Sequence, residues 1–200
     1  MDTTVYWWRV KAKNVAGWSP FSLARKFTTA SEVTVCIPLQ NSWNLISLPV
    51  EVANDSSAHL FPVCPACPFA YVPGSGYVQD CRLRIGAGYW LRCSSSNPCI
   101  TGSPVLLDSI PVVVGWNLIG SISVPLNTSA ISTVPSGIIN SNFFGFDAVY
   151  VPVSVVLPGS AYWVKVSQAG VIILDGTGSI IARPPATSRS TKSLHGPKTK

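Results

Sequence analysis

Two stretches of equal length decide how this chain folds. Residues 43–92 are WNLISLPVEVANDSSAHLFPVCPACPFAYVPGSGYVQDCRLRIGAGYWLR, and residues 116–165 are WNLIGSISVPLNTSAISTVPSGIINSNFFGFDAVYVPVSVVLPGSAYWVK. A shift of 73 positions, with no gap, aligns the Trp-Asn-Leu-Ile start, the Tyr-Trp end and the basic residue beyond it, Arg92 or Lys165. The chain therefore contains an internal duplication, which predicts two copies of one structural unit packed together.

Each copy predicts short strands and turns. A strand begins at the Trp-Asn-Leu-Ile motif, and one helical turn follows near residues 55–61 of the first copy. A hairpin comes next, over residues 69–78 in the first copy and 143–151 in the second, and it leads into the Tyr-Trp strand. The second copy gains a final strand at residues 171–174.

The composition supports a mainly β protein. Only 11% of the residues are charged, while the chain holds 15 Gly, 17 Pro and 7 Trp. Aromatic and β-branched residues favour a pleated surface, and Pro or Gly interrupts every apolar stretch that could extend into a long helix. We expect a pseudo-symmetric, duplicated antiparallel β unit over residues 36–175, with copies at about 41–92 and 114–165.

A different pattern precedes the repeat. Residues 5–29, VYWWRVKAKNVAGWSPFSLARKFTT, begin with apolar residues that alternate with basic ones, which predicts a half-buried strand. A turn at residues 14–17 and a returning strand at 23–29 would complete a two-stranded ribbon. Because such a ribbon is marginal alone in water, we expect Trp8 and Val10 to be exposed or to lean on the repeat.

The ribbon sequence resembles the end of a fibronectin type III domain. The resemblance is carried by the spacing Tyr6-x-Trp8-x-Val10-x-Ala12-x-Asn14-x-x-Gly17. It implies that residues 1–30 are the last strands of a truncated domain of this family. It also implies that Tyr6 is the tyrosine that bonds back to a preceding loop in β-sandwiches.

The two copies resemble the "GWNLIS…GYW" repeats near the C-termini of large exported bacterial multidomain proteins. This resemblance implies that the chain is the C-terminal fragment of a larger exported protein. Two departures stand out: Ser42 occupies the place of an expected Gly, and no sorting domain follows residue 175.

The net charge of +6 is concentrated at the two ends. Residues 1–30 hold five basic and one acidic residue, residues 183–200 hold five basic and no acidic residues, and residues 31–182 hold four basic and seven acidic residues. A nucleic-acid-binding protein would carry its positive charge on the folded part, so we expect no nucleic-acid partner. Residues 182–200 are rich in Pro, Ser and Lys and predict a disordered basic tail.

No membrane or export segment is expected from the sequence. The apolar runs are far shorter than the ~20 residues that span a bilayer, so no transmembrane segment is predicted. The N-terminus has neither the basic region nor the long apolar region of a signal peptide.

All six cysteines lie between positions 36 and 99. This clustering indicates disulfides and an oxidising compartment, so we expect a secreted or cell-surface protein. We expect local bonds, with Cys93 joined to Cys99 and Cys81 joined to Cys64 or Cys67. Free buried thiols and zinc are the alternatives, but zinc commonly uses two close cysteine pairs and the second pair is missing. No metal ligand is assigned.

Few residues could support catalysis. The only histidines are His59 and His195, and the acidic residues are scattered singly. We therefore expect no catalytic residue and no cofactor, and a non-catalytic structural or adhesive module whose partner is an extracellular protein or a glycan. The alternative is a carbohydrate-binding module in which Trp side chains stack on sugar rings.

The Tyr-Trp strands separate these two hypotheses. Successive strand side chains face opposite ways, so Tyr89 and Tyr162 should be buried on one face. At least one Trp on the other face should be partly exposed beside its basic neighbour. The candidate ligand-stacking residues are Trp90, Arg92, Trp163 and Lys165.

Overall fold

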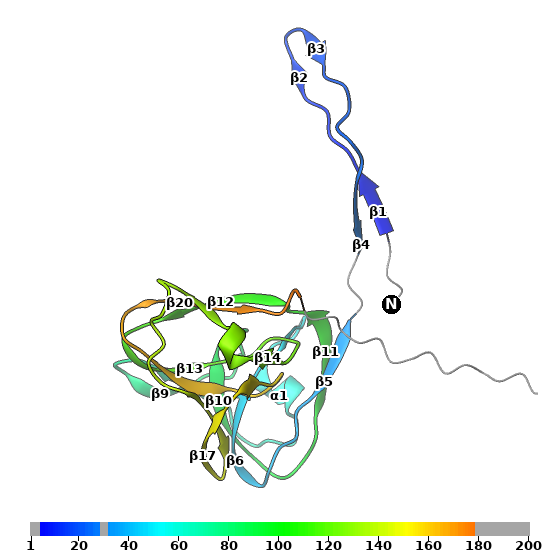
Figure 1. Cartoon of the computed structure of the whole chain (residues 1–200). Helices are drawn as coiled ribbons and strands as arrows, with labels where there is room; N and C mark the ends of the chain where they lie inside the picture. The colour runs from blue at the N-terminus through cyan, green and yellow to red at the C-terminus, as the bar shows by residue number, and fades with distance from the viewer. Residues whose placement is uncertain (1–4, 29–31, 179–200) are drawn as a thin grey trace, which may run out of the picture.

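The structure is a computed structural model that describes residues 5–28 and 32–178 (Figure 1). It is mainly antiparallel β, with one short α-helix, α1 (Ser57–Leu60), and one 3-10 turn, η1 (Thr128–Ala130). In this part of the chain, no helix is long and apolar enough to cross a membrane. The expected basic tail at 182–200 lies outside the described residues.

Residues 5–28 form a separate extended ribbon (Figure 1). Strand β1 (Val5–Trp8) pairs with β4 (Arg25–Thr28), and β2 (Lys13–Asn14) pairs with β3 (Gly17–Trp18). The predicted ribbon is confirmed, but the predicted half-burial of its first strand is wrong. The expected exposure of Trp8 and Val10 is confirmed, at 45% and 57%, since no further strand of the described residues covers the face on which they lie.

Residues 32–178 are called the body below, and the body consists of two halves. The first half contains two sheets. One has the order β6-β10-β8-β9, made of β6 (Ser42–Ser47), β10 (Gly88–Cys93), β8 (Phe69–Val72) and β9 (Gly76–Gln79). The other has the order β5-β11-β7, made of β5 (Val33–Cys36), β11 (Cys99–Pro104) and β7 (Val50–Glu51).

The second half has sheets of the same kind. One has the order β13-β19-β16-β17, made of β13 (Gly115–Ile119), β19 (Tyr162–Val166), β16 (Phe143–Asp147) and β17 (Val149–Val153). The other has the order β12-β20-β15, made of β12 (Leu107–Val112), β20 (Gly170–Asp175) and β15 (Ser132–Val134). A short pair, β14 (Leu126–Asn127) and β18 (Val155–Val156), completes it.

The strand pairing shows how similar the two halves are. Tyr89 opposes Ile46 in the first half, and 73 positions later Tyr162 opposes Ile119. The first strand of the second hairpin, β16, is displaced by two residues relative to β8, because Phe144 and not Asn142 opposes Trp163, whereas β17 keeps the 73-residue shift. A displacement of two keeps every side chain on its face of the sheet. The expectation that only the second copy has a final strand is wrong, since β11 is the counterpart of β20.

Backbone contacts join the two halves. Isolated β-bridges link Ile46 to Ser160 and Ala87 to Ile119, which are again equivalent positions. Gly88 lies between the halves, and a Cβ atom built on it would lie 2.7 Å from Leu118 Cγ. The close approach of the halves therefore depends on glycine at this position.

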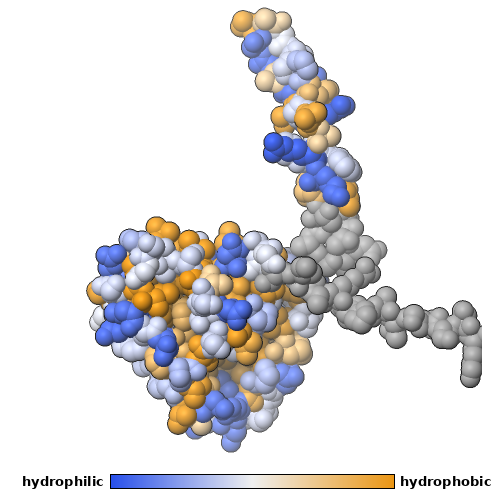
Figure 2. All heavy atoms as spheres, in the orientation of Figure 1, coloured by the Kyte–Doolittle hydropathy of each residue, from blue (hydrophilic) through white to orange (hydrophobic). Residues whose placement is uncertain are grey.

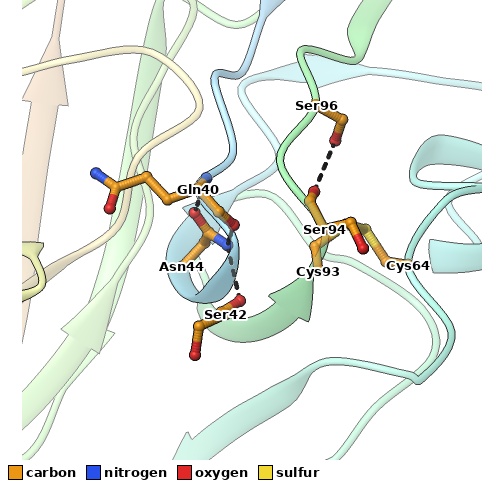
Figure 3. The surroundings of a disulfide bond; sticks show 7 residues. All are labelled: Gln40, Ser42, Asn44, Cys64, Cys93, Ser94 and Ser96. Atoms are coloured by element: carbon orange, nitrogen blue, oxygen red, sulfur yellow. Dashed lines mark hydrogen bonds between the residues drawn. A yellow bond between two sulfur atoms is a disulfide. The ribbon is translucent and has the colours of Figure 1, made fainter.

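The Asn of each Trp-Asn-Leu-Ile motif is buried and closes the loop before its strand. The Asn44 side chain accepts a hydrogen bond from the Gln40 N–H (2.8 Å) and donates to the carbonyls of Gln40 (3.0 Å) and Ser42 (3.1 Å) (Figure 3). Asn117 makes the same three bonds with Val113 and Gly115. This loop forces a positive φ two residues before the Asn, 102° at Ser42 and 97° at Gly115.

The Tyr of each Tyr-Trp motif is buried, as predicted: Tyr89 is 0% exposed and Tyr162 is 3% exposed. Each hydroxyl accepts a hydrogen bond from a backbone N–H five residues earlier, from Arg84 at 2.9 Å and from Leu157 at 2.8 Å. Burial raises the pKa of both phenols.

Three disulfides link the six cysteines, and all of them lie in the first half. The bonds join Cys36 to Cys99, Cys64 to Cys93 and Cys67 to Cys81 (Figure 3 shows the surroundings of the second). The expected Cys93–Cys99 bond is wrong, because the pairing of β5 with β11 places Cys36 opposite Cys99. The expected bond from Cys81 is confirmed, with Cys67 as its partner. Three disulfides indicate an oxidising compartment.

Candidate functional site: twin aromatic pockets

The two four-stranded sheets turn an aromatic face toward each other. Trp43, Trp90 and Phe69 share one face of the first sheet, since Phe69 opposes Trp90 and Trp43 lies diagonally across the β6–β10 ladder. A small cluster at the centre, built on Leu45, Leu118, Ala161 and Trp163, packs the two faces together. Aromatic residues at the margins of this contact line two pockets.

The first pocket is lined by Trp43, Phe69, Tyr77 and Trp90 of the first half and by Phe146 of the second, and it encloses about 400 Å³. Its rings meet edge to face. The Trp43 and Trp90 rings lie 6.4 Å apart at 89°, and the Trp90 and Phe146 rings lie 4.7 Å apart at 78°. Phe146 thus closes a pocket that belongs mostly to the other half.

The second pocket is lined by Trp116, Phe144, Tyr150 and Trp163 of the second half and by Tyr71 of the first, and it also encloses about 400 Å³. The Trp116 and Trp163 rings lie 6.5 Å apart at 86°, and the Tyr71 and Trp163 rings lie 4.7 Å apart at 68°. Each half therefore lends one ring to the pocket of the other.

All five positions of one pocket correspond to positions of the other. Three pairs follow the 73-residue shift: Trp43 with Trp116, Trp90 with Trp163 and Tyr77 with Tyr150. The remaining pairs, Phe69 with Phe144 and Tyr71 with Phe146, follow once the two-residue displacement of β16 is included. The cysteines are confined to one half, whereas every pocket position is aromatic in both.

The pockets are open to solvent on one side. Trp43 is 41% exposed and Trp116 43% exposed, and Tyr77 and Tyr150 are 54% and 52% exposed. Packing between the halves would not require large aromatic side chains to stay half-exposed at equivalent places. Figure 2 shows hydrophobic residues reaching the surface of the body as well as the ribbon.

The pocket linings carry no charged residue, and their polar atoms are phenol hydroxyls and indole N–H groups. Trp163 is 9% exposed, and its buried Nε1 makes no hydrogen bond of acceptable geometry. The Tyr150 hydroxyl lies near this N–H and near the Tyr77 hydroxyl, and burial raises the pKa of Tyr150. An unpaired buried donor of this kind is uncommon in folded proteins.

Of the four predicted stacking residues, Trp90 and Trp163 line the two pockets, whereas Arg92 and Lys165 lie outside the linings. The expectation that at least one of the two Trp is partly exposed is confirmed. Trp90 is partly exposed and Trp163 is buried. Arg92 lies directly opposite Trp43 in the β6–β10 ladder, and Lys165 lies opposite Trp116. Both basic residues thus neighbour the exposed Trp that begins each repeat.

In the part of the chain that the structure describes, Arg92 and Lys165 do not stack on an indole ring. In residues 5–28 and 32–178, the cation–π contacts all lie in the ribbon, such as Arg9 over Phe21 at 4.1 Å and Lys11 over Trp18 at 4.4 Å. In the body, the Trp90 ring instead contacts Phe146 from the other half. The sequence pattern did not indicate that Trp43 and Trp116 line pockets, although each begins a copy of the repeated motif.

Other side-chain groups in the described residues offer less. They contain no cluster of three or more His, Cys, Asp or Glu side chains that could hold a metal ion. A polar hollow beside β7 and β11 includes Glu51 and His59.

No protein-family model, curated protein or solved structure matches this chain.

Proposed function

We propose that this chain is a non-catalytic, extracellular adhesive module that contacts its partner through the twin aromatic pockets. The observation that carries the proposal is the repetition of a half-exposed Trp, Trp43 or Trp116, at the mouth of two equivalent pockets. Large aromatic side chains that are partly exposed are the residues on which protein interfaces most depend.

Several features of the body support an extracellular, structural role. Three disulfides fit a secreted or cell-surface location. Asp80 and Arg84 form an ion pair on the surface, as do Asp55 and Arg82, so these carboxylates already have partners. A double unit with two equivalent contact sites suits adhesion, because two linked sites that engage together raise the overall affinity.

The proposal includes the origin of both parts of the chain. The ribbon would be the closing hairpin of a fibronectin type III-like sandwich. The antiparallel pairing of Tyr6 with Phe27 and the exposure of the Tyr6 and Trp8 face support this. The body would be a pseudo-symmetric duplication from a larger exported protein, supported by the common register of β6–β10 and β13–β19.

A carbohydrate-binding module is the second candidate function. It is favoured by the partial exposure of Trp43 and Trp116, since aromatic rings commonly stack on sugar rings. Trp90 and Trp163 would then form the inner walls of the sites, with Arg92 and Lys165 at their margins.

The test uses the oxidised full chain on a glycan array and on a panel of purified extracellular-matrix proteins. We expect binding on one of the two surfaces, and the double variant Trp43→Ala/Trp116→Ala should lose it. Trp7→Ala is the matched control, because Trp7 is 68% exposed in the ribbon. Binding that persists in the double variant, or that is lost equally in Trp7→Ala, would contradict the proposed role of the pockets.

A further inference from the structure

The shape of each pocket restricts what can enter it. A sugar ring stacks best on a single flat and open aromatic face, whereas these linings consist of rings set nearly at right angles, 89° between Trp43 and Trp90 and 86° between Trp116 and Trp163. Perpendicular rings form a corner that receives a compact apolar group from the side. The pyrrolidine ring of proline has this shape, and aromatic-lined grooves are the usual receptors of polyproline II segments.

The hydrogen-bonding groups point to the same ligand chemistry. Indole N–H groups only donate, and the half-exposed Trp43 and Trp116 each carry one. A proline-rich segment offers carbonyl acceptors that are unpaired in the polyproline II helix, and its prolines bring no N–H that needs an acceptor. A sugar would bring several hydroxyl donors into a lining that contains no carboxylate, and unpaired buried donors are costly.

Charge at the margins completes the pattern. Arg92 and Lys165 are exposed and lie opposite the exposed Trp of their own half, outside the pocket linings but at equivalent places beside them. Asp147, which follows Phe146 in β16, lies on the other face of that strand by alternation and accepts a hydrogen bond from Gln40 Nε2 at 2.7 Å. An acidic residue beside the prolines would therefore complement each margin.

We infer that each pocket binds an acidic, proline-rich segment of another extracellular protein in the polyproline II conformation. The prolines occupy the corner between the two Trp rings, and the acidic residue faces Arg92 or Lys165. The inference rests on the proposed function and names the partner of the same pockets.

The test titrates three synthetic peptides into the full oxidised chain and follows binding by calorimetry. The first repeats Pro-Pro-Glu, the second repeats Pro-Pro-Lys, and the third repeats Gly-Ser-Glu. We expect the first to bind more tightly than the other two. Trp43→Ala/Trp116→Ala should weaken it at least about tenfold, as for a central interface residue, while Trp7→Ala leaves it unchanged.

Charge reversal separates this inference from a general loss of folding. In Arg92→Glu/Lys165→Glu the aromatic rings are intact, so the preference should move from the Pro-Pro-Glu to the Pro-Pro-Lys peptide. Equal binding of the Gly-Ser-Glu peptide, or an unchanged preference in the charge-reversed chain, would overturn the inference. Loss of peptide binding alongside Trp-dependent binding to glycans would overturn it too, and would leave the pockets as the functional site.

Discussion

The backbone before each Trp-Asn-Leu-Ile strand offers a matched test of conformational strain. The equivalent residues Ser42 and Gly115 have φ values of 102° and 97°, in the region that glycine adopts readily and other residues avoid. The two halves thus have the same backbone conformation at this position but different residues, Ser in one and Gly in the other. Opposite substitutions, Ser42→Gly and Gly115→Ala, should therefore change the free energy of unfolding in opposite directions.

The magnitude follows from two terms. A non-glycine residue in this region costs about 1–3 kcal/mol. Removing glycine gains about 0.4–1 kcal/mol by restricting the unfolded chain. A Cβ built on Gly115 meets no atom within 4 Å, so strain acts there without a clash. We expect Gly115→Ala to destabilise the protein by about 1 kcal/mol and Ser42→Gly to stabilise it by a similar amount.

The measurement is urea unfolding of the oxidised chain, followed by far-ultraviolet circular dichroism, with the slope compared between variants. A change in midpoint with an unchanged slope reports stability alone. The reasoning would be refuted if Ser42→Gly lowered the midpoint, or if Gly115→Ala left it unchanged. Either result would mean that the loop relaxes to an unstrained conformation, despite the three hydrogen bonds that the Asn side chain two residues later makes to it.

Three further perturbations test other parts of the body. Gly88→Ala should lower the free energy of unfolding by about 1–3 kcal/mol, as in an overpacked core, because the new methyl group meets Leu118, and the urea midpoint should fall with it. Gly178→Ala, whose new methyl group meets nothing within 4 Å, should be neutral. Replacing Cys36 and Cys99 with serine should lower the free energy of unfolding by about 4 kcal/mol, because the disulfide closes a loop of 63 residues. A loss smaller than that caused by removing the Cys67–Cys81 bond, which closes a loop of 14 residues, would contradict this loop-entropy estimate. Burial raises the pKa of Tyr162 above its unfolded value of 10.0, so the neutral phenol stabilises the fold. This stabilisation is fully present below pH 10.0 and is lost as the pH rises through the folded pKa. The loss of stability in alkali should therefore be less steep in Tyr162→Phe.

The sequence predicts the strands and core positions that the two repeats share. The alignment of Trp43 with Trp116 fixes equivalent strands, and two-residue alternation around Trp90 and Trp163 places both tyrosines in the core. The flanking strands β5 and β12 were not recognised as equivalent, because their chemistry differs and only their pairing with β11 and β20 relates them. The disulfide of Cys36 depends on that long-range pairing, so local spacing pointed to a wrong partner for Cys99.

The pockets show a different limit of sequence-based prediction. Alternation assigns Trp90 and Arg92 to one face of one sheet, but it does not say that this face meets a second sheet. The ring that closes each pocket comes from the opposite half, and the two-residue displacement of β16 hides the match between Tyr71 and Phe146. A gapless alignment pairs these residues with Phe144 and Pro73, and so conceals the exchange.

The bond between Cys36 and Cys99 also determines how the body would respond to a pulling force. Tension that enters at the start of the body passes from Cys36 to Cys99 through the covalent bond, so the 63 residues of chain between them, about 210 Å of contour length, stay slack. The second half has no such bond and would extend first. Its extension would withdraw Phe146 from the first pocket and dismantle the second, so mechanical load alone would release whatever the two pockets hold.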